Sequence, residues 1–139
     1  AGAEAVVNHR ESNWGKAVLD LSGGHKIDRV IEVEFGANLP ELIRCVGIGA
    51  TIATYSSTVV PEPALPFRTM MFMDLTIRMV IVYAMPEAAK AQAVADTQVA
   101  LTEGGLRHRI AETLPFDQMA KAHEIIEEGS VRGCVVVTI

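Results

Sequence analysis

The chain has 139 residues, of which 50% are hydrophobic and 21% charged, and this composition is typical of one globular domain. Its net charge of -5 leaves no basic stripe to neutralise a phosphate backbone, which argues against nucleic acid as a partner. No stretch approaches the roughly 20 apolar residues of a membrane span, so we expect a cytoplasmic protein without a membrane partner. The mean hydropathy of +0.27 predicts that some apolar surface meets a partner.

Short runs of apolar and β-branched residues predict five strands, and a weaker run predicts a sixth. The five are expected at residues 4–8, 28–33, 50–55, 75–83 and 133–139, and the weaker one at 106–114. Several of these runs are apolar on both faces, as in buried parallel strands.

Helical spacing and capping residues predict four helices between the strands. The residues expected to begin them are Ser12, Asn38, Pro86 and Asp117, and those expected to end them are Gly23, Gly47, Gly104 and Gly129. The GIGAT run at Gly47 follows a helix and precedes a strand, so it is predicted to be a turn. Regular alternation of strands and helices indicates an α/β fold with a mostly parallel sheet and right-handed crossovers.

The two cysteines and four histidines show no pattern typical of a metal site. Cys45 and Cys134 lie far apart in apolar sequence, which favours reduced, buried thiols over a disulfide. Neither a CxxC spacing nor two histidines one helical turn apart is present, so we expect no metal. The sequence also has no GxGxxG motif and no nucleophile elbow.

Polar residues at the carboxyl ends of the strands are the first candidates for a site, because ligands of open α/β sheets lie there. Ser56 and Ser57 follow the strand that ends at Tyr55, and their hydroxyl and backbone groups suit a ribose or a phosphate. The alternative is a simple turn. His9 and Arg10 suit an anion, or they form a solvated strand end.

Residues 75–83 form a long apolar run near the end of the alternating series. At the edge of a sheet such a strand would offer unpaired backbone groups to another chain. We therefore expect a homodimer through the strand from Leu75 to Tyr83. The methionine-rich segment before it, residues 69–75, is either an exposed patch or part of the core, and the core is favoured.

Five segments resemble, in order and spacing, the second half of NADPH:quinone oxidoreductases, a branch of the medium-chain dehydrogenase/reductase superfamily. They are GAEAVVNHRE, DRVIEVEFGAN, ATYSS, LTIRMVIVY and LPFDQMAKAHEIIEEGSVRGCVVV, which together extend over nearly the whole chain. The last is the most distinctive, with Ala122-His123-Glu124 on a helix followed by Gly133 and an apolar strand. The resemblance implies a Rossmann-like, mostly parallel sheet with flanking helices.

The Rossmann sheet of that family has the strand order 3-2-1-4-5-6, and the resemblance places the start of this chain just before the third strand. The first two strands, the glycine-rich loop and the preceding catalytic domain are then expected to be missing. Residues 1–105 correspond to the C-terminal portion of the dinucleotide-binding domain. Residues 106–139 correspond to the segment that returns to the catalytic domain.

The resemblance also implies which residues contact the cofactor. His9 takes a position near the adenosine end that is commonly tyrosine, and Val33 ends a strand that passes close to the cofactor. Tyr55-Ser56-Ser57 replaces an aromatic-glycine-small turn against the nicotinamide half. Val82-Tyr83-Ala84 resembles the segment whose backbone meets the carboxamide.

The function implied is that of an oxidoreductase that transfers hydride from NADPH, with NADH less favoured, to a quinone, an enone or a related carbonyl, without a metal. No catalytic residue is expected in this chain, because those groups belong to the missing domain, and the fragment alone is expected to be inactive. Two alternatives stay open: a non-catalytic binding or dimerisation module, and a fragment of a zinc-type alcohol dehydrogenase.

Overall fold

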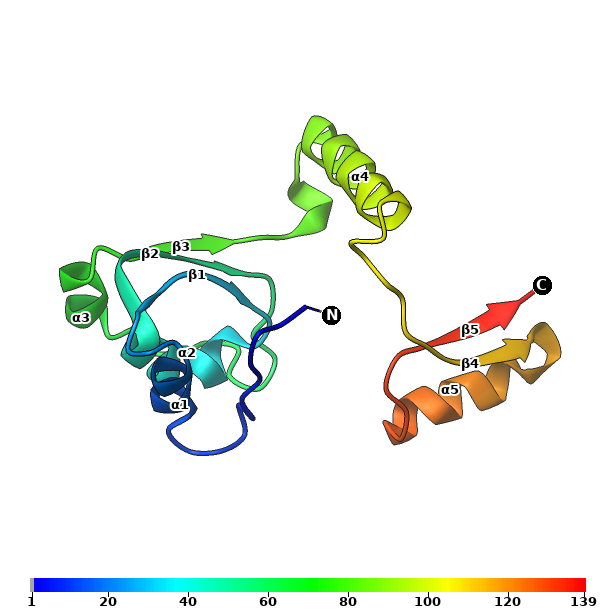
Figure 1. Ribbon diagram of the computed structural model, residues 1–139, viewed down its shortest axis with the longest axis horizontal. Helices are drawn as coiled ribbons and strands as arrows, with labels where there is room; N and C mark the ends of the chain where they lie inside the picture. Colours follow the sequence, from blue (N-terminus) through cyan, green and yellow to red (C-terminus); the bar gives the residue numbers. More distant parts are fainter. Residues whose placement is uncertain (1) are drawn as a thin grey trace. The chain divides into compact units, whose positions relative to one another are not determined.

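The computed structural model describes residues 2–139 and shows two compact units, Gly2–Glu87 and Ala88–Ile139. Each unit combines a parallel sheet with helices (Figure 1). The predicted α/β fold with parallel strands and flanking helices is therefore confirmed. No helix in this described range is long and apolar enough to cross a membrane.

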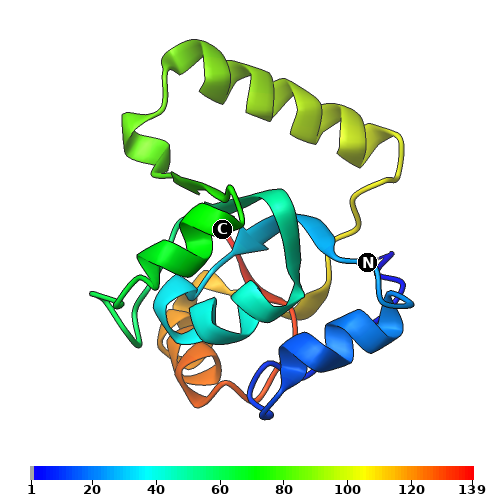
Figure 2. The same cartoon turned by 90° about the vertical axis from the view of Figure 1, so that its left-hand side faces the viewer.

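The N-terminal unit is built on a three-stranded parallel sheet with the order β1-β2-β3. Its elements are α1 (Trp14–Leu21), β1 (Ile27–Glu32), α2 (Phe35–Cys45), β2 (Val46–Thr54), α3 (Phe67–Phe72), β3 (Thr76–Met79) and the short 3-10 helix η1 (Val82–Ala84). In both views α1 and α2 lie next to each other on the same side of the strands (Figures 1 and 2).

The core of this unit forms where α2 packs on the sheet. Phe35 and Leu39 lie one helical turn apart on α2 and enclose Ile52, the central side chain of β2, which is fully buried. The register aligns Val30 and Ile77 with Ile52 across the sheet, on the same face. Neighbouring residues on a strand point to opposite faces, and Ile31 on the other face is 82% exposed. The helix thus determines which face of the sheet becomes the core.

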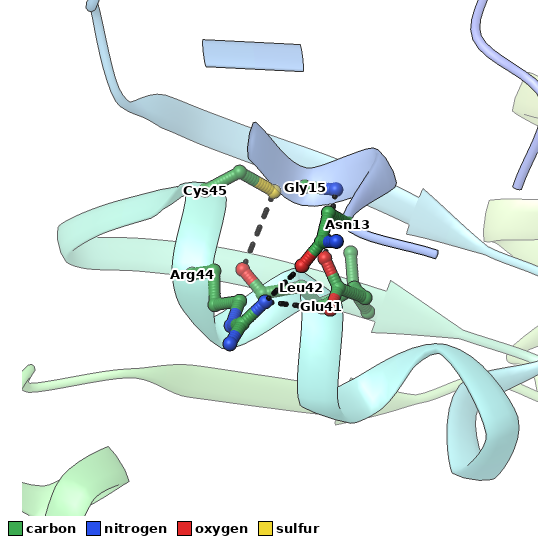
Figure 3. Close-up of polar contacts among 6 residues, drawn as sticks. All are labelled: Asn13, Gly15, Glu41, Leu42, Arg44 and Cys45. Atoms are coloured by element: carbon green, nitrogen blue, oxygen red, sulfur yellow. Dashed lines mark hydrogen bonds and ion pairs between the residues drawn. The ribbon is translucent and has the colours of Figure 1, made fainter. Parts of the chain in front are cut away.

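A polar contact joins α1 to α2 (Figure 3). The backbone N–H of Gly15 donates to Glu41 Oε2 at 3.0 Å. Arg44 Nη1 donates to Glu41 Oε1 at 3.0 Å and to Asn13 Oδ1 at 3.0 Å. A Cβ at Gly15 would lie 2.4 Å from the carbonyl oxygen of Glu41, so the two helices approach this closely only because residue 15 is glycine.

The C-terminal unit is a smaller parallel α/β arrangement. It contains α4 (Glu87–Thr102), β4 (Ile110–Pro115), η2 (Phe116–Gln118), α5 (Met119–Glu128) and β5 (Cys134–Thr138). α5 connects the parallel pair β4-β5, and Leu114 of β4 and Ala122 of α5 are buried. As predicted, Gly129 ends α5, with a φ of 61° that suits glycine.

Two predicted strands differ from the structure. Residues 4–8 form no strand, and Val6 is 86% exposed, because within residues 2–139 no neighbouring strand lies beside them to accept their hydrogen bonds. The predicted strand at 75–83 is shortened to β3, Thr76–Met79. Its last residues turn into η1 instead, where Ala84 N–H donates to the carbonyl of Ile81.

Three predicted helix starts and the GIGAT turn are also corrected. α1 begins after Asn13 rather than Ser12, α2 begins at Phe35 rather than Asn38, and Gln118 precedes α5 where Asp117 was expected. The GIGAT run lies inside β2, because the chain passes from α2 directly into the strand at Val46. The run contains a β-bulge, since the register of pairing with β1 shifts between Val46 and Thr51.

The two cysteines have different environments. Cys45 is 2% exposed, and its thiol donates to the carbonyl oxygen of Leu42 at 3.4 Å. Burial raises the pKa of the Cys45 thiol above its usual range. Cys134 is a free thiol at the surface, so the prediction that both thiols are buried is wrong for Cys134. It begins β5, at the end of the strand rather than in its middle.

We expect Gly15→Ala to destabilise the protein by about 1–3 kcal/mol, because the added methyl group overlaps the backbone of Glu41 and forces α1 away from α2. Urea unfolding measures this change. Gly105→Ala is the control, since its Cβ would lie 3.6 Å from the nearest atom, the carbonyl oxygen of Ala100. Equal stability of the two variants would contradict the close helix contact.

We expect one of the two thiols to react with an aromatic disulfide reagent at pH 8 in the native chain, and both to react in denaturant. Cys134→Ser should abolish the native reaction.

The raised pKa of Cys45 predicts how the stability of the protein changes at alkaline pH. The buried neutral thiol contributes stability below pH 9.0, which is the ordinary pKa of a cysteine thiol. This contribution is lost as the pH rises through the raised pKa of Cys45. A Cys45→Ala variant should lack this alkaline loss.

Candidate functional site

A cavity of about 330 Å³ lies at the carboxyl ends of β2 and β3. This is the edge of a parallel sheet at which ligands bind. The wall on the β2 side is formed by Thr54 and the predicted turn Tyr55-Ser56-Ser57, and the wall on the β3 side by Met79 and Val80. The remaining lining residues are Phe35, Pro61, Pro63 and Leu65.

The cavity wall is aromatic and apolar, with a few hydroxyl groups. Phe35 connects it to the core, because this side chain is 3% exposed and packs with Leu39 and Ile52. Tyr55 is 62% exposed and is therefore accessible at the rim. Neither lysine nor arginine lines the cavity. This donor set suits a flat, uncharged ring better than a phosphate.

The loop that forms the cavity is tied to the start of α2 by hydrogen bonds, and we call this contact between residues 34–36 and residues 56–60 the clasp. Glu34 accepts from two successive backbone groups, Thr58 N–H at 2.8 Å on Oε2 and Val59 N–H at 3.0 Å on Oε1. Phe35 N–H donates to the carbonyl oxygen of Ser56 at 3.0 Å. The clasp therefore fixes the backbone of the loop.

Ser57 completes the clasp with its side chain. Its hydroxyl oxygen accepts from Gly36 N–H at 2.9 Å and donates to the carbonyl oxygen of Val60 at 2.6 Å. A Cβ at Gly36 would lie 2.2 Å from the Val60 oxygen, so the close approach requires glycine. The Ser57 hydroxyl proton is committed to this structural bond.

Glu32, the last residue of β1, is a buried carboxylate beside the clasp. It is 5% exposed, and its Oε1 accepts from Glu34 N–H at 2.6 Å and from Asn38 Nδ2 at 2.8 Å. Burying a carboxylate is costly unless hydrogen bonds compensate, and these two bonds do so. Glu32 thereby shapes the turn from β1 into α2, and Asn38 bonds to it instead of capping the helix.

A second, more apolar cavity of about 460 Å³ lies between α2 and the proline-rich segment at 60–66. It shares Pro63 and Leu65 with the first cavity. The proline-rich segment thus contributes to the walls of both cavities.

The structure brings three of the eight predicted cofactor residues together in the cavity, namely Tyr55, Ser56 and Ser57. Val33 follows β1 and is 51% exposed, outside the cavity lining. Residues 82–84 form the exposed helix η1 just beyond Val80. His9 lies in an exposed turn of the N-terminal unit. Glu34 and Phe35 belong to the strand end around Val33, which the sequence places close to the cofactor, but the sequence predicted no separate role for either residue.

No group of three or more His, Cys, Asp or Glu side chains among residues 2–139 could hold a metal ion. The described site thus consists of ring-sized apolar walls, hydroxyl groups and backbone held by the clasp. Nothing in this part of the chain resembles a set of zinc ligands.

Comparison with known sequences gives consistent relatives. A family model described as zinc-binding dehydrogenase matches residues 1–137. Quinone oxidoreductase from Pongo abelii is 29% identical over 131 residues, which are 93% of this chain and 39% of that protein. Quinone oxidoreductase from Homo sapiens is 28% identical, with the same coverage of 93% and 39%. The chain thus spans well under half the length of these relatives.

Solved structures show the same fold. An NAD-dependent alcohol dehydrogenase superimposes with a TM-score of 0.76 at 27% identity, covering 99% of this chain and 38% of that one. A mycobacterial quinone oxidoreductase reaches a TM-score of 0.82 at 17% identity, with coverage of 99% and 44%. CurA from Vibrio vulnificus in complex with NADPH reaches 0.74 at 16%, with coverage of 99% and 43%.

The match of the family model to nearly the whole chain agrees with the parallel α/β fold and with the resemblance found in the sequence. The chain belongs to the zinc-binding dehydrogenase family of the medium-chain dehydrogenase/reductase superfamily, a family of oxidoreductases, and is similar to quinone oxidoreductases.

Proposed function

We propose that the protein containing this chain transfers hydride from NADPH to a quinone, an enone or a related carbonyl, and that the cavity beside Tyr55 receives the nicotinamide half of the cofactor. The observation that carries this proposal is the position and chemistry of the cavity. It lies at the carboxyl ends of parallel strands and has an uncharged, partly aromatic wall. A neutral amide-bearing ring suits such a wall, and the bound cofactor supplies the hydride.

The residues of this chain contribute orientation and exclusion of water rather than acid or base chemistry. Phe35 and Met79 offer apolar contact surface, and Tyr55 offers a flat ring at the rim. The clasp holds the backbone of residues 56–60, so these walls keep one geometry. Val33, His9 and residues 82–84 remain proposed contacts to other parts of the cofactor.

The cavity lining offers no lysine or arginine to a phosphate, so we assign the phosphates of the dinucleotide to another part of the protein. We infer that the glycine-rich loop expected from the resemblance provides that contact in the whole protein. The relatives that support NADPH are CurA and a second mycobacterial protein, both solved with NADPH bound. NADH is the alternative cofactor.

A zinc-type alcohol dehydrogenase is the second candidate function. It is favoured by the alcohol dehydrogenases among the structural neighbours and by the description of the family model. The similarity to quinone oxidoreductases supports the first candidate. A chelator distinguishes the two, because a zinc-dependent reaction stops when the metal is removed.

We expect the full-length protein to bind NADPH more tightly than NADH and to oxidise NADPH when 1,4-benzoquinone is added, with full activity after dialysis against a chelator. Calorimetry measures the affinities, and absorbance at the nicotinamide band measures the reaction. The isolated chain should bind NADPH at least about a hundredfold more weakly, since it lacks the expected phosphate contact. Activity lost to the chelator and restored by zinc would favour the alcohol dehydrogenase instead.

We further propose that two copies associate through β3. This strand ends the order β1-β2-β3, so one of its edges is free within the N-terminal unit. Apolar side chains at the end of β3 and just after it are exposed, including Met79 at 75% and Ile81 at 58%.

We expect Ile81→Lys to raise the dimer dissociation constant at least about tenfold, because the interface would have to bury an unpaired charge from each copy. Light scattering across a concentration series measures it. Ile126→Lys is the matched control, since Ile126 lies on α5 and is 56% exposed. A wild-type protein that is monomeric at all concentrations would refute the proposed interface.

A further inference from the structure

We infer that Glu34 is a positioning residue, whose carboxylate holds the loop at residues 56–60 in the one geometry that places the nicotinamide ring for hydride transfer. This inference rests on the proposed function of the cavity. It concerns a residue that does not line the cavity, and it assigns to Glu34 a role in orientation rather than in affinity.

The carboxylate of Glu34 has a geometry that restrains the loop. Both oxygens of Glu34 are used on neighbouring groups, Thr58 N–H at 2.8 Å and Val59 N–H at 3.0 Å. Hydrogen bonds to an ionised acceptor are stronger than those between neutral groups. Thr58 and Val59 are exposed, and Val59 is 74% exposed, so packing contributes little to holding this part of the loop. The carboxylate is therefore a principal restraint on it.

The loop held by Glu34 forms part of the cavity wall. Tyr55, Ser56 and Ser57 line the cavity immediately before Thr58, and Pro61 lines it three residues later. The two amides held by Glu34 thus lie between two stretches of cavity wall. Movement of Thr58 and Val59 would displace the wall on both sides.

The contacts of Glu34 are independent of the rest of the clasp. Phe35 N–H and Gly36 N–H hold Ser56 and Ser57 from the backbone of α2, and no side-chain substitution at 34 removes these donors. Loss of the Glu34 carboxylate therefore loosens residues 58–59 while the remainder of the clasp persists. The expected consequence is a misplaced ring in a protein that is still folded.

The experiment compares Glu34→Ala and Glu34→Gln with wild type in the full-length protein. Hydrogen exchange at the Thr58 and Val59 amides tests the restraint without any cofactor. We expect exchange at least about tenfold faster in Glu34→Ala, and an intermediate effect in Glu34→Gln, which keeps one of the two acceptor oxygens.

The second readout is the single-turnover rate of NADPH oxidation by benzoquinone, beside the Kd for NADPH. We expect the rate to fall about tenfold in Glu34→Ala, because small displacements of reacting groups are costly. The Kd should stay within about threefold, since the phosphates supply most of the affinity. Glu34→Gln should restore part of the rate.

Glu41→Ala is the matched control. Glu41 also accepts a backbone N–H, that of Gly15 at 3.0 Å, but it joins α1 to α2 and does not line the cavity. It should lower stability while leaving the single-turnover rate unchanged. An equal loss of rate in both variants would mean that Glu34 acts only through stability, and would overturn the inference.

Three further outcomes are decisive. Unchanged exchange of the two amides in Glu34→Ala overturns the inference whatever the activity. Faster exchange with an unchanged rate shows that the loop does not position the ring, and overturns the inference while the proposed function stands. A wild-type protein that neither binds NADPH nor oxidises it overturns the proposed function, and the positioning role is overturned with it.

Discussion

The packing of α2 on the central strand β2 is the constraint on which the rest of the N-terminal unit depends. Ile52 is fully buried because Phe35 and Leu39 cover it, and that contact decides which face of the sheet is the core. Phe35 belongs to two structures at once, since it also lines the cavity at the strand ends. The hydrophobic core thus sets the position of one cavity wall, and close packing around Phe35 makes this wall rigid.

The arrangement of side chains at the strand ends follows from the hydrogen-bond partners that the backbone N–H groups find there. A chain leaving β1 for α2 exposes N–H groups that have no helical partner. In this molecule the buried Glu32 carboxylate takes one of them, from Glu34, and the loop after β2 takes those of Phe35 and Gly36. The loop is therefore held by groups that the helix start must satisfy in any case. Glu34 adds the only side-chain carboxylate that reaches back to the loop in the described contacts.

The sequence predicted the α/β class and the polar break after the strand at Tyr55-Ser56-Ser57, because both depend on local patterns such as β-branched runs. The residues at 4–8 have the same strand pattern, but a strand exists only beside a partner, and pairing is not a local property. The prediction of a strand at residues 75–83 was wrong for a related reason. Their apolar run is uniform, yet the chain leaves the sheet after Met79 and coils into η1. An apolar run predicts burial better than it predicts extended geometry.

The role of Ser57 was also beyond local reasoning, since it depends on Gly36, which lies 21 residues away. The missing side chain of Gly36 leaves room for the Ser57 hydroxyl, which a Cβ at 36 would approach to 2.7 Å. The hydroxyl in turn supplies the acceptor that the Gly36 N–H needs. A serine after a strand suggests ligand binding when it is considered alone. Together with Gly36, however, Ser57 has a structural role, because its hydroxyl proton is donated to the carbonyl oxygen of Val60. What remains for a ligand is the shape of the wall, the ring of Tyr55 and the hydroxyl of Ser56, whose oxygen lies 3.2 Å from that of Thr58. In the proposed function this cavity therefore acts through the shape and orientation of its wall, and the phosphates of the cofactor are bound outside it.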